Sequence, residues 1–121
     1  MKILIVEDNQ DSAESLQDIL EMEGHTVHLT ETGEAALEKD FPDQAELSLV
    51  NLKIPAMGGR AMIERVFEMD SGARVIVLTG NSIKEEIEEV AKMPILKVIR
   101  KPYDPGKLLN EIDKIRSDNA T

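Results

Sequence analysis

The chain has 121 residues, a formal net charge of −10 and no cysteine. The acidic surplus argues against a nucleic-acid or anionic-membrane surface, because lysine and arginine hold phosphate groups. The lack of cysteine excludes thiol catalysis, disulfides and thiolate-bound metals. No apolar run approaches membrane-spanning length, and the start of the chain turns acidic too early for a signal peptide. We therefore expect one cytoplasmic domain over 1–121, ending in a polar tail at 117–121.

Short apolar runs alternate with segments of helical periodicity along the whole chain, which is typical of βα units and a parallel sheet. In chain order, the apolar runs predict strands at 2–6, 25–29, 46–51, 74–78 and 95–99. The periodic segments predict helices at about 11–23, from Thr32 to Phe41, at 59–69, from Ser82 onward and from Asp104 onward.

Start and stop signals support these helices. Gly24 suits the end of the first helix, Ser82-x-x-Glu85 forms a capping box, and Asp104 followed by Pro105 suits the start of the last helix. The side chains expected on the inner faces are Ala13, Leu16, Leu20, Ala35, Ala36, Leu37, Ile63, Val66, Phe67, Ile83, Ile87, Val90, Ala91, Leu108, Ile112 and Ile115. Met57, Met62 and Met69 are expected to pack rather than to bind a ligand.

The strands differ in composition, which predicts their order. The runs at 2–6, 46–51 and 74–78 are almost entirely apolar, as in central strands covered on both faces. The run at 25–29 contains His25 and His28, which we expect on the surface of an edge strand, and the last run is polar enough for the opposite edge. Right-handed crossovers then favour the order 2-1-3-4-5, a doubly wound α/β sheet flanked by five helices.

Polar residues follow four of the five strands. Glu7 and Asp8 follow the first, Asn51 ends the third, Thr79 follows the fourth and Lys101 follows the fifth. Because ligands of such sheets bind beyond the carboxyl ends of the strands, we expect these side chains to converge. Two acids, an amide, a hydroxyl and an amine suit a hard cation together with a phosphoryl group.

With these residues in this order, the chain resembles the receiver domain of two-component response regulators, of the CheY-like, flavodoxin-like fold. The segment 51–59, NLKIPAMGG, is similar to the D-x-x-x-P-x-M-x-G motif of that family. The resemblance covers the whole chain. It implies a Mg²⁺ site in which Asp8, Asn51 and the Lys53 carbonyl are ligands and Glu7 acts mainly through a water.

The resemblance also implies roles around a phosphoryl group. Thr79 and Lys101 would contact the phosphoryl oxygens, and the peptide bond between Lys101 and Pro102 is expected to be cis. Val98 stands where the family usually has an aromatic residue that rotates with the hydroxyl of the fourth strand.

Asn51 departs from the family pattern, which has the phosphoacceptor aspartate at this position. A carboxamide oxygen is a poor nucleophile and cannot form an acyl phosphate. As a neutral ligand it should also weaken Mg²⁺ binding, and Lys101 loses a potential ion-pair partner. The chain is therefore either an atypical pseudo-receiver or an ordinary receiver locked by replacement of aspartate with asparagine.

As a receiver, the chain is expected to be a binding and conformational switch and not an enzyme. The resemblance implies a histidine kinase or phosphotransfer protein as one partner. An output domain or target protein would bind the face made by the fourth helix, the last strand and the last helix, on a monomer or weak dimer. The alternative is a flavodoxin-like electron carrier, which shares the strand order. That function needs a Ser/Thr-rich loop after the first strand and aromatic residues around the flavin, and the only aromatic residues are Phe41, Phe67 and Tyr103.

Overall fold

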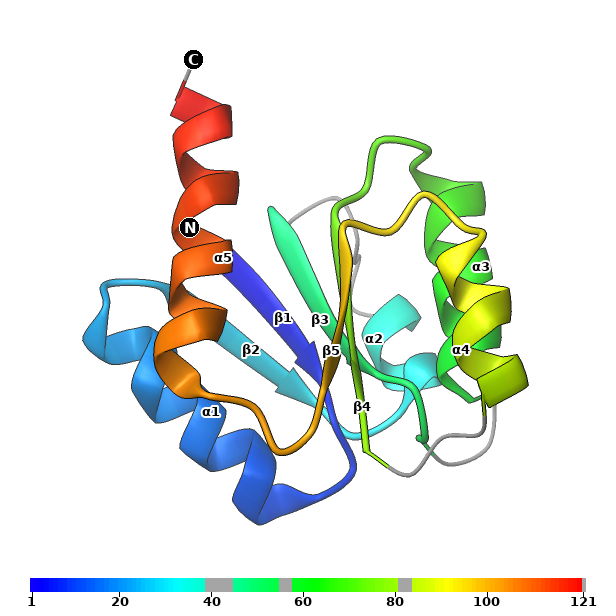
Figure 1. The fold of residues 1–121 in the computed structure, drawn as a ribbon, viewed down its shortest axis with the longest axis horizontal. Helices are drawn as coiled ribbons and strands as arrows, with labels where there is room; N and C mark the ends of the chain where they lie inside the picture. The colour runs from blue at the N-terminus through cyan, green and yellow to red at the C-terminus, as the bar shows by residue number, and fades with distance from the viewer. Residues whose placement is uncertain (39–44, 55–57, 81–83, 121) are drawn as a thin grey trace.

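The computed structural model describes residues 1–38, 45–54, 58–80 and 84–120. A five-stranded parallel sheet lies between two layers of helices, and its order is β2-β1-β3-β4-β5 (Figure 1). The predicted fold class and strand order are thereby confirmed. The strands are β1 (Lys2–Val6), β2 (Thr26–Thr30), β3 (Leu47–Asn51), β4 (Val75–Thr79) and β5 (Lys97–Arg100).

Five helices follow the strands in alternation. They are α1 (Gln10–Met22), α2 (Gly33–Glu38), α3 (Gly59–Met69), α4 (Lys84–Ala91) and α5 (Pro105–Ala120). Helices α1 and α5 cover one face of the sheet, and α2, α3 and α4 cover the other (Figure 1). Helix α5 continues through 117–120, so the segment predicted as a polar tail is helical up to Ala120. None of the described helices combines the length and apolar character needed to cross a membrane.

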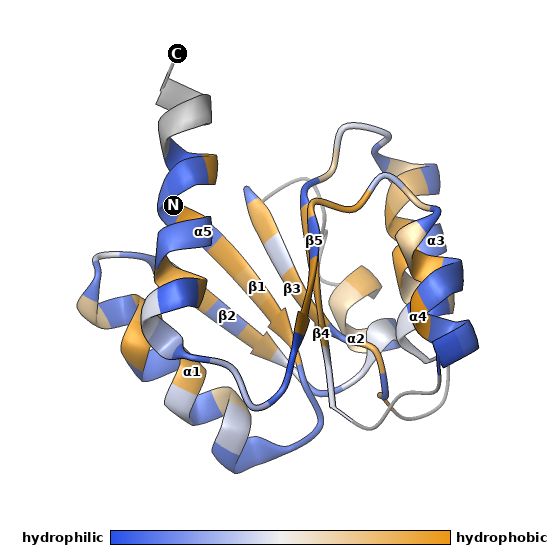
Figure 2. Ribbon diagram, in the orientation of Figure 1, coloured by the Kyte–Doolittle hydropathy of each residue, from blue (hydrophilic) through white to orange (hydrophobic). Residues whose placement is uncertain are grey.

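Successive side chains of the central strands point to opposite faces of the sheet, so a separate hydrophobic core forms on each face. Ile3 and Ile5 of β1 pack toward α1 and α5, and Leu4 and Val6 pack toward the other layer. Every residue of β3 and β4 is buried, as predicted for central strands. Figure 2 shows the resulting apolar sheet between helices whose outer faces are hydrophilic. Burying one such aliphatic side chain contributes about 1.5–3 kcal/mol.

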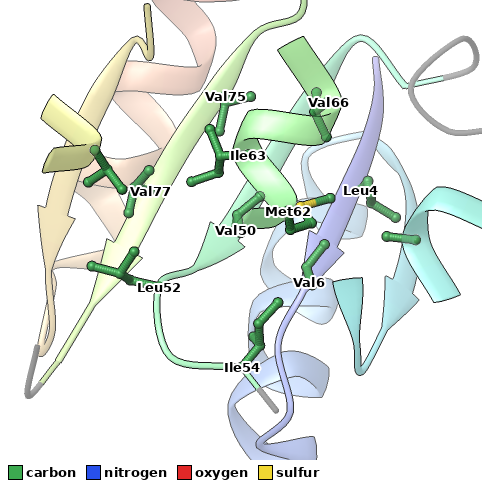
Figure 3. Close-up of a cluster of buried hydrophobic side chains, with 12 residues drawn as sticks. Leu4, Val6, Val50, Leu52, Ile54, Met62, Ile63, Val66, Val75 and Val77 are labelled. Carbon is green, nitrogen blue, oxygen red and sulfur yellow. The ribbon is translucent and has the colours of Figure 1, made fainter. Parts of the chain in front are cut away.

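The hydrophobic core beneath α3 extends to the carboxyl ends of the strands, where the predicted polar site residues lie. Figure 3 shows Met62, Ile63 and Val66 of α3 lying against β1, β3 and β4. Leu52 and Ile54, which follow β3, belong to the same cluster and are also buried. The buried side chains of Leu52 and Ile54, on either side of Lys53, therefore fix the position of the Lys53 backbone.

Side-chain caps and a glycine define the ends of several helices. The Asn9 side chain accepts a hydrogen bond from Ser12 N at 3.0 Å, and Gly24 ends α1 with φ of 89°. Thr32 Oγ1 accepts from Ala35 N at 3.0 Å, and Asp104 Oδ1 accepts from Gly106 N at 2.8 Å. The predicted capping box at Ser82 lies outside the described residues, as do Ile83 and Met57.

Three helix side chains are less buried than the sequence predicted. Ala91 is exposed, because it follows the fully buried Val90 and is turned about 100° around the helix axis from it. Ile87 is only half-buried, so α4 contacts the core chiefly through Val90. Met69 is 49% exposed at the end of α3, whereas Met62 is fully buried as predicted.

His25 was predicted on the surface but is buried, with 5% of its area exposed. It precedes β2, and its backbone N–H donates to Leu20 O at 3.2 Å, which ties it to the end of α1. The Met1 ammonium lies 3.1 Å from Nδ1, and an ammonium can only donate, so His25 is neutral in this contact. Burial is the main cause that lowers the pKa of His25, and the positive charges of Met1 and Arg116 lower it further.

Folding stability should therefore fall as the pH drops below about 6.5, the ordinary pKa of histidine. The unfolded chain binds a proton there, while the folded chain binds it only at lower pH, so protonation favours unfolding. We expect the free energy of unfolding in urea to decrease between about pH 7.5 and 5.5. The substitution His25→Gln should flatten that decrease, and His28→Gln, at an exposed site, should leave it unchanged. Equal slopes in all three proteins would contradict this assignment.

Candidate functional site

The carboxyl ends of β1 and β3 lie side by side and bring Glu7 next to Asn51. In the register of these strands Val6 pairs with Val50, so the residues that follow them are neighbours. β5 lies two strands away from β3, yet the Lys101 side chain reaches back across this edge to β1. The site is thus assembled from the beginning, middle and end of the chain.

Glu7 is at the centre of the site and is only 4% exposed. Its Oε2 accepts a hydrogen bond from Lys101 Nζ at 2.6 Å. Its Oε1 accepts from Asn51 Nδ2 at 3.1 Å and from the backbone N–H of Asn9 at 3.0 Å. The Glu7 backbone N–H donates to Thr30 O at 3.0 Å. Hydrogen bonds to an ionised carboxylate are stronger than those between neutral groups, so the buried charge is well compensated.

The orientation of the Asn51 amide follows from its neighbours. Asn51 is 8% exposed, and its Nδ2 donates to Lys53 O at 2.8 Å as well as to Glu7. Both groups facing this nitrogen are acceptors only, and an amide oxygen in its place would receive no hydrogen bond from either. The Asn51 side chain therefore presents donors to the pocket.

The backbone of Lys101 is hydrogen-bonded to β4, and its side chain forms an ion pair with Glu7. Its backbone N–H donates to Thr79 O at 2.7 Å, and its peptide bond to Pro102 is cis, as the resemblance implied. Its side chain is 26% exposed. The sequence predicted that Lys101 loses an ion-pair partner when position 51 is neutral. In the structure, the Lys101 ammonium forms an ion pair with Glu7. Lys101 therefore has an ion-pair partner, even though the side chain at position 51 carries no charge.

The side chains of three predicted site residues make no hydrogen bond to this network within the described part of the chain. Asp8 is exposed, and its carboxylate forms no hydrogen bond or ion pair with the described residues. Thr79 is 1% exposed, and its Oγ1 has no hydrogen-bond partner among the described residues. Val98 is half-buried and packs into the core cluster on the α3 and α4 side, in register with Val77.

The sequence predicted a Mg²⁺ ion among Glu7, Asp8, Asn51 and Lys53, and the groups as arranged do not fit one. Mg²⁺ takes oxygen ligands at about 2.0–2.1 Å. Here the oxygens of Glu7 and Lys53 face the amide protons of Asn51. Within the described ranges, no three acidic or histidine side chains form a group able to hold a metal.

A groove of about 690 Å³ opens beside the Glu7–Lys101 pair, between α1 and the loop that follows β5. Ser12, Ser15 and Tyr103 are among its lining residues. Burial raises the pKa of the Tyr103 hydroxyl, and the negative charge of Glu7 raises it further, so the phenol stays protonated at neutral pH. Tyr103 and Asn9 were not predicted from the sequence to belong to the site, although Tyr103 lies two positions from Lys101 and Asn9 directly follows Asp8.

Gly59, at the start of α3, fixes the backbone that carries Asn51. Its N–H donates to Leu52 O at 3.0 Å. A Cβ atom on Gly59 would lie 2.6 Å from Leu52 O and 2.7 Å from Asn51 O, closer than real contacts allow. Only glycine lets α3 begin this near to the end of β3.

Comparisons with known proteins agree with this architecture. The family model described as the response regulator receiver domain matches residues 3–113. Sporulation initiation phosphotransferase F of Bacillus subtilis is 28% identical over 113 residues, which cover 93% of this chain and 91% of that protein. A response regulator receiver protein of Anaeromyxobacter is 30% identical over 90% of this chain, but over only 46% of its own length. The chain thus spans about half the length of some curated relatives that it matches.

Solved structures share the fold over nearly the whole chain. A CheY-like receiver domain protein from Methanospirillum hungatei is 29% identical, with a TM-score of 0.90 and coverage of 98% of this chain and 96% of that chain. A two-component response regulator from Clostridium difficile has a TM-score of 0.91 and covers 100% of this chain and 99% of its own, and at 18% identity it supports the fold alone. Because the family model, the strand order and these structures agree, the chain belongs to the response regulator receiver domain family.

Proposed function

We propose that this receiver domain acts in phosphorelay signalling as a conformational and binding switch that does not accept a phosphoryl group at Asn51. Receiver domains are regulatory modules of two-component signalling, and we assign this one no catalytic turnover. The proposal rests chiefly on one observation. The side chain at the carboxyl end of β3 is an amide whose nitrogen donates to Glu7 at 3.1 Å and to Lys53 O at 2.8 Å.

The chemistry of an amide explains why phosphorylation should fail. Attack on a phosphoryl donor requires an electron-rich oxygen, and the carboxamide oxygen of Asn51 carries no formal charge and is a poor nucleophile. The nitrogen has its lone pair delocalised into the carbonyl, and its protons are engaged by Glu7 and Lys53. The substitution has this effect whether asparagine arose naturally, as in a pseudo-receiver, or replaced an aspartate in an ordinary receiver.

We propose that Thr79, Lys101 and Val98 take the roles that the resemblance implied. Lys101 and the buried hydroxyl of Thr79 lie at the same edge of the sheet, where they would contact phosphoryl oxygens. Val98 would be the switch position, and its small side chain already packs into the core. Receiver domains generally bind Mg²⁺ at their acidic pocket, and we propose that Asn51 weakens that binding here.

The proposed partners follow from family membership. Receiver domains interact with histidine kinases or phosphotransfer proteins and with output domains. We propose that an output domain or target binds the face of α4, β5 and α5, and that the domain is a monomer or weak dimer. The comparisons give no support to the flavodoxin-like alternative, and among the described residues Tyr103 is the only aromatic one that lines the groove beside Glu7.

Incubating the chain with acetyl phosphate and Mg²⁺ tests the proposal, with intact-mass spectrometry as the readout. We expect the mass to stay unchanged, because Asn51 cannot form the acyl phosphate. A receiver domain with aspartate at the equivalent position, treated in parallel, checks that the donor is active. A stoichiometric, Mg²⁺-dependent phosphoryl adduct mapped to Asn51 would refute the proposal.

A further inference from the structure

The pocket contains a buried negative charge that is compensated from within the chain. Glu7 is 4% exposed, and a carboxylate removed from water is costly unless a charge or hydrogen bonds compensate it. In a receiver pocket a bound divalent cation would supply that compensation. Among the described residues, the positive charge paired with Glu7 is the Lys101 ammonium, 2.6 Å from Glu7 Oε2.

The Glu7 and Lys53 oxygens beside Asn51 already accept proton donors. Glu7 Oε1 accepts from the Asn51 amide and from the Asn9 backbone, and Glu7 Oε2 accepts from Lys101. Lys53 O accepts from the second proton of the same Asn51 amide. A cation entering between Glu7 and Lys53 would have to displace both amide hydrogen bonds and receive no negative charge from position 51 in return.

We infer that the Asn51 amide and the Lys101 ammonium together take the place of the divalent cation, so that Mg²⁺ adds no stability to this pocket. The amide joins β1 to the backbone after β3, and the ammonium joins β1 to the end of β5. The inference deepens the proposed weakening of Mg²⁺ binding, and it goes beyond the proposed loss of phosphorylation, which requires nothing about metal binding.

The substitution Asn51→Asp should make the pocket a site that a cation binds and stabilises. It places a carboxylate oxygen where Nδ2 now lies, 3.1 Å from Glu7 Oε1 and 2.8 Å from Lys53 O, with no proton between them. Two carboxylates this close repel each other in a buried site, and one Lys101 cannot neutralise both. A divalent cation would relieve that repulsion by binding the same oxygens.

Thermal unfolding tests the inference in millimolar Mg²⁺ and in EDTA at matched ionic strength. For Asn51→Asp we expect Mg²⁺ to raise Tm by about 4 °C or more, as for a ligand well above its Kd. We expect no change for the unsubstituted chain. Asn110→Asp makes the same charge change at an exposed site on α5 and should also show none. If Asn51→Asp is unfolded in EDTA, recovery of its near-UV circular dichroism with Mg²⁺ is the supporting result.

A second measurement uses the unsubstituted chain alone. The side-chain NH₂ resonances of Asn51 should keep their chemical shifts when Mg²⁺ is added. An equal Mg²⁺-dependent rise in Tm for the unsubstituted chain, or a saturable shift of those resonances, would overturn the inference. A variant Asn51→Asp that is insensitive to Mg²⁺ would overturn it as well. Each of these results leaves the phosphorylation outcome untouched, so the two proposals fail separately.

Discussion

Replacing Gly59 with alanine should destabilise the domain by about 2 kcal/mol or more, because overpacking against a rigid partner forces the backbone to move. The added Cβ would lie 2.6 Å from Leu52 O and 2.7 Å from Asn51 O. Both neighbours are backbone atoms, and the Leu52 backbone N–H donates a hydrogen bond to Leu78 O at 2.8 Å. The clash can be relieved only by moving α3 or the end of β3, so Asn51 should shift too.

Urea unfolding measures this effect, and Gly72→Ala is the matched control. At Gly72 the nearest atom to an added Cβ is a side-chain oxygen of Asp70 at 3.5 Å, an ordinary contact. We expect Gly72→Ala to change stability by no more than about 0.5 kcal/mol. Equal stability of Gly59→Ala and Gly72→Ala would show that the junction between β3 and α3 is not as tight as described.

The strand order and the location of the pocket could be predicted because they depend on patterns that are local in sequence. Apolar runs fix which strands are buried on both faces, and handedness then limits the order. The polar residue that ends each run must lie at the carboxyl edge. These two rules placed Glu7, Asn51 and Lys101 at one end of the sheet, and the structure joins them through Glu7.

The partners of these groups could not be predicted in the same way. That Asn51 turns its nitrogen into the pocket depends on Lys53 O and Glu7 Oε1, two acceptors that meet only in three dimensions. Lys101 forms a hydrogen bond with Glu7, which lies 94 positions away in the sequence. His25 was assigned to the surface from the polarity of its run, but its backbone bond to Leu20 O places it at a buried turn.

The substitution Asn51→Asp should turn the chain into a phosphoacceptor. A carboxylate oxygen of the new aspartate would attack the phosphorus of acetyl phosphate, forming the acyl phosphate bond while acetate leaves. Lys101 lies 2.6 Å from Glu7 and would share its charge with the new carboxylate and the phosphoryl oxygens. Thr79 Oγ1, buried and without a partner among the described residues, is available to donate a hydrogen bond to them. In-line phosphoryl transfer gains mostly from such positioning and charge neutralisation.

Intact-mass spectrometry of Asn51→Asp beside the unsubstituted chain, after incubation with acetyl phosphate and Mg²⁺, tests the central claim most directly. We expect the variant to gain one phosphoryl group, mapped to position 51, and the unsubstituted chain to gain none. The pocket would then be complete except for its acceptor. If neither protein is modified under conditions that phosphorylate an ordinary receiver, Asn51 is not the only defect of the pocket and the account is wrong.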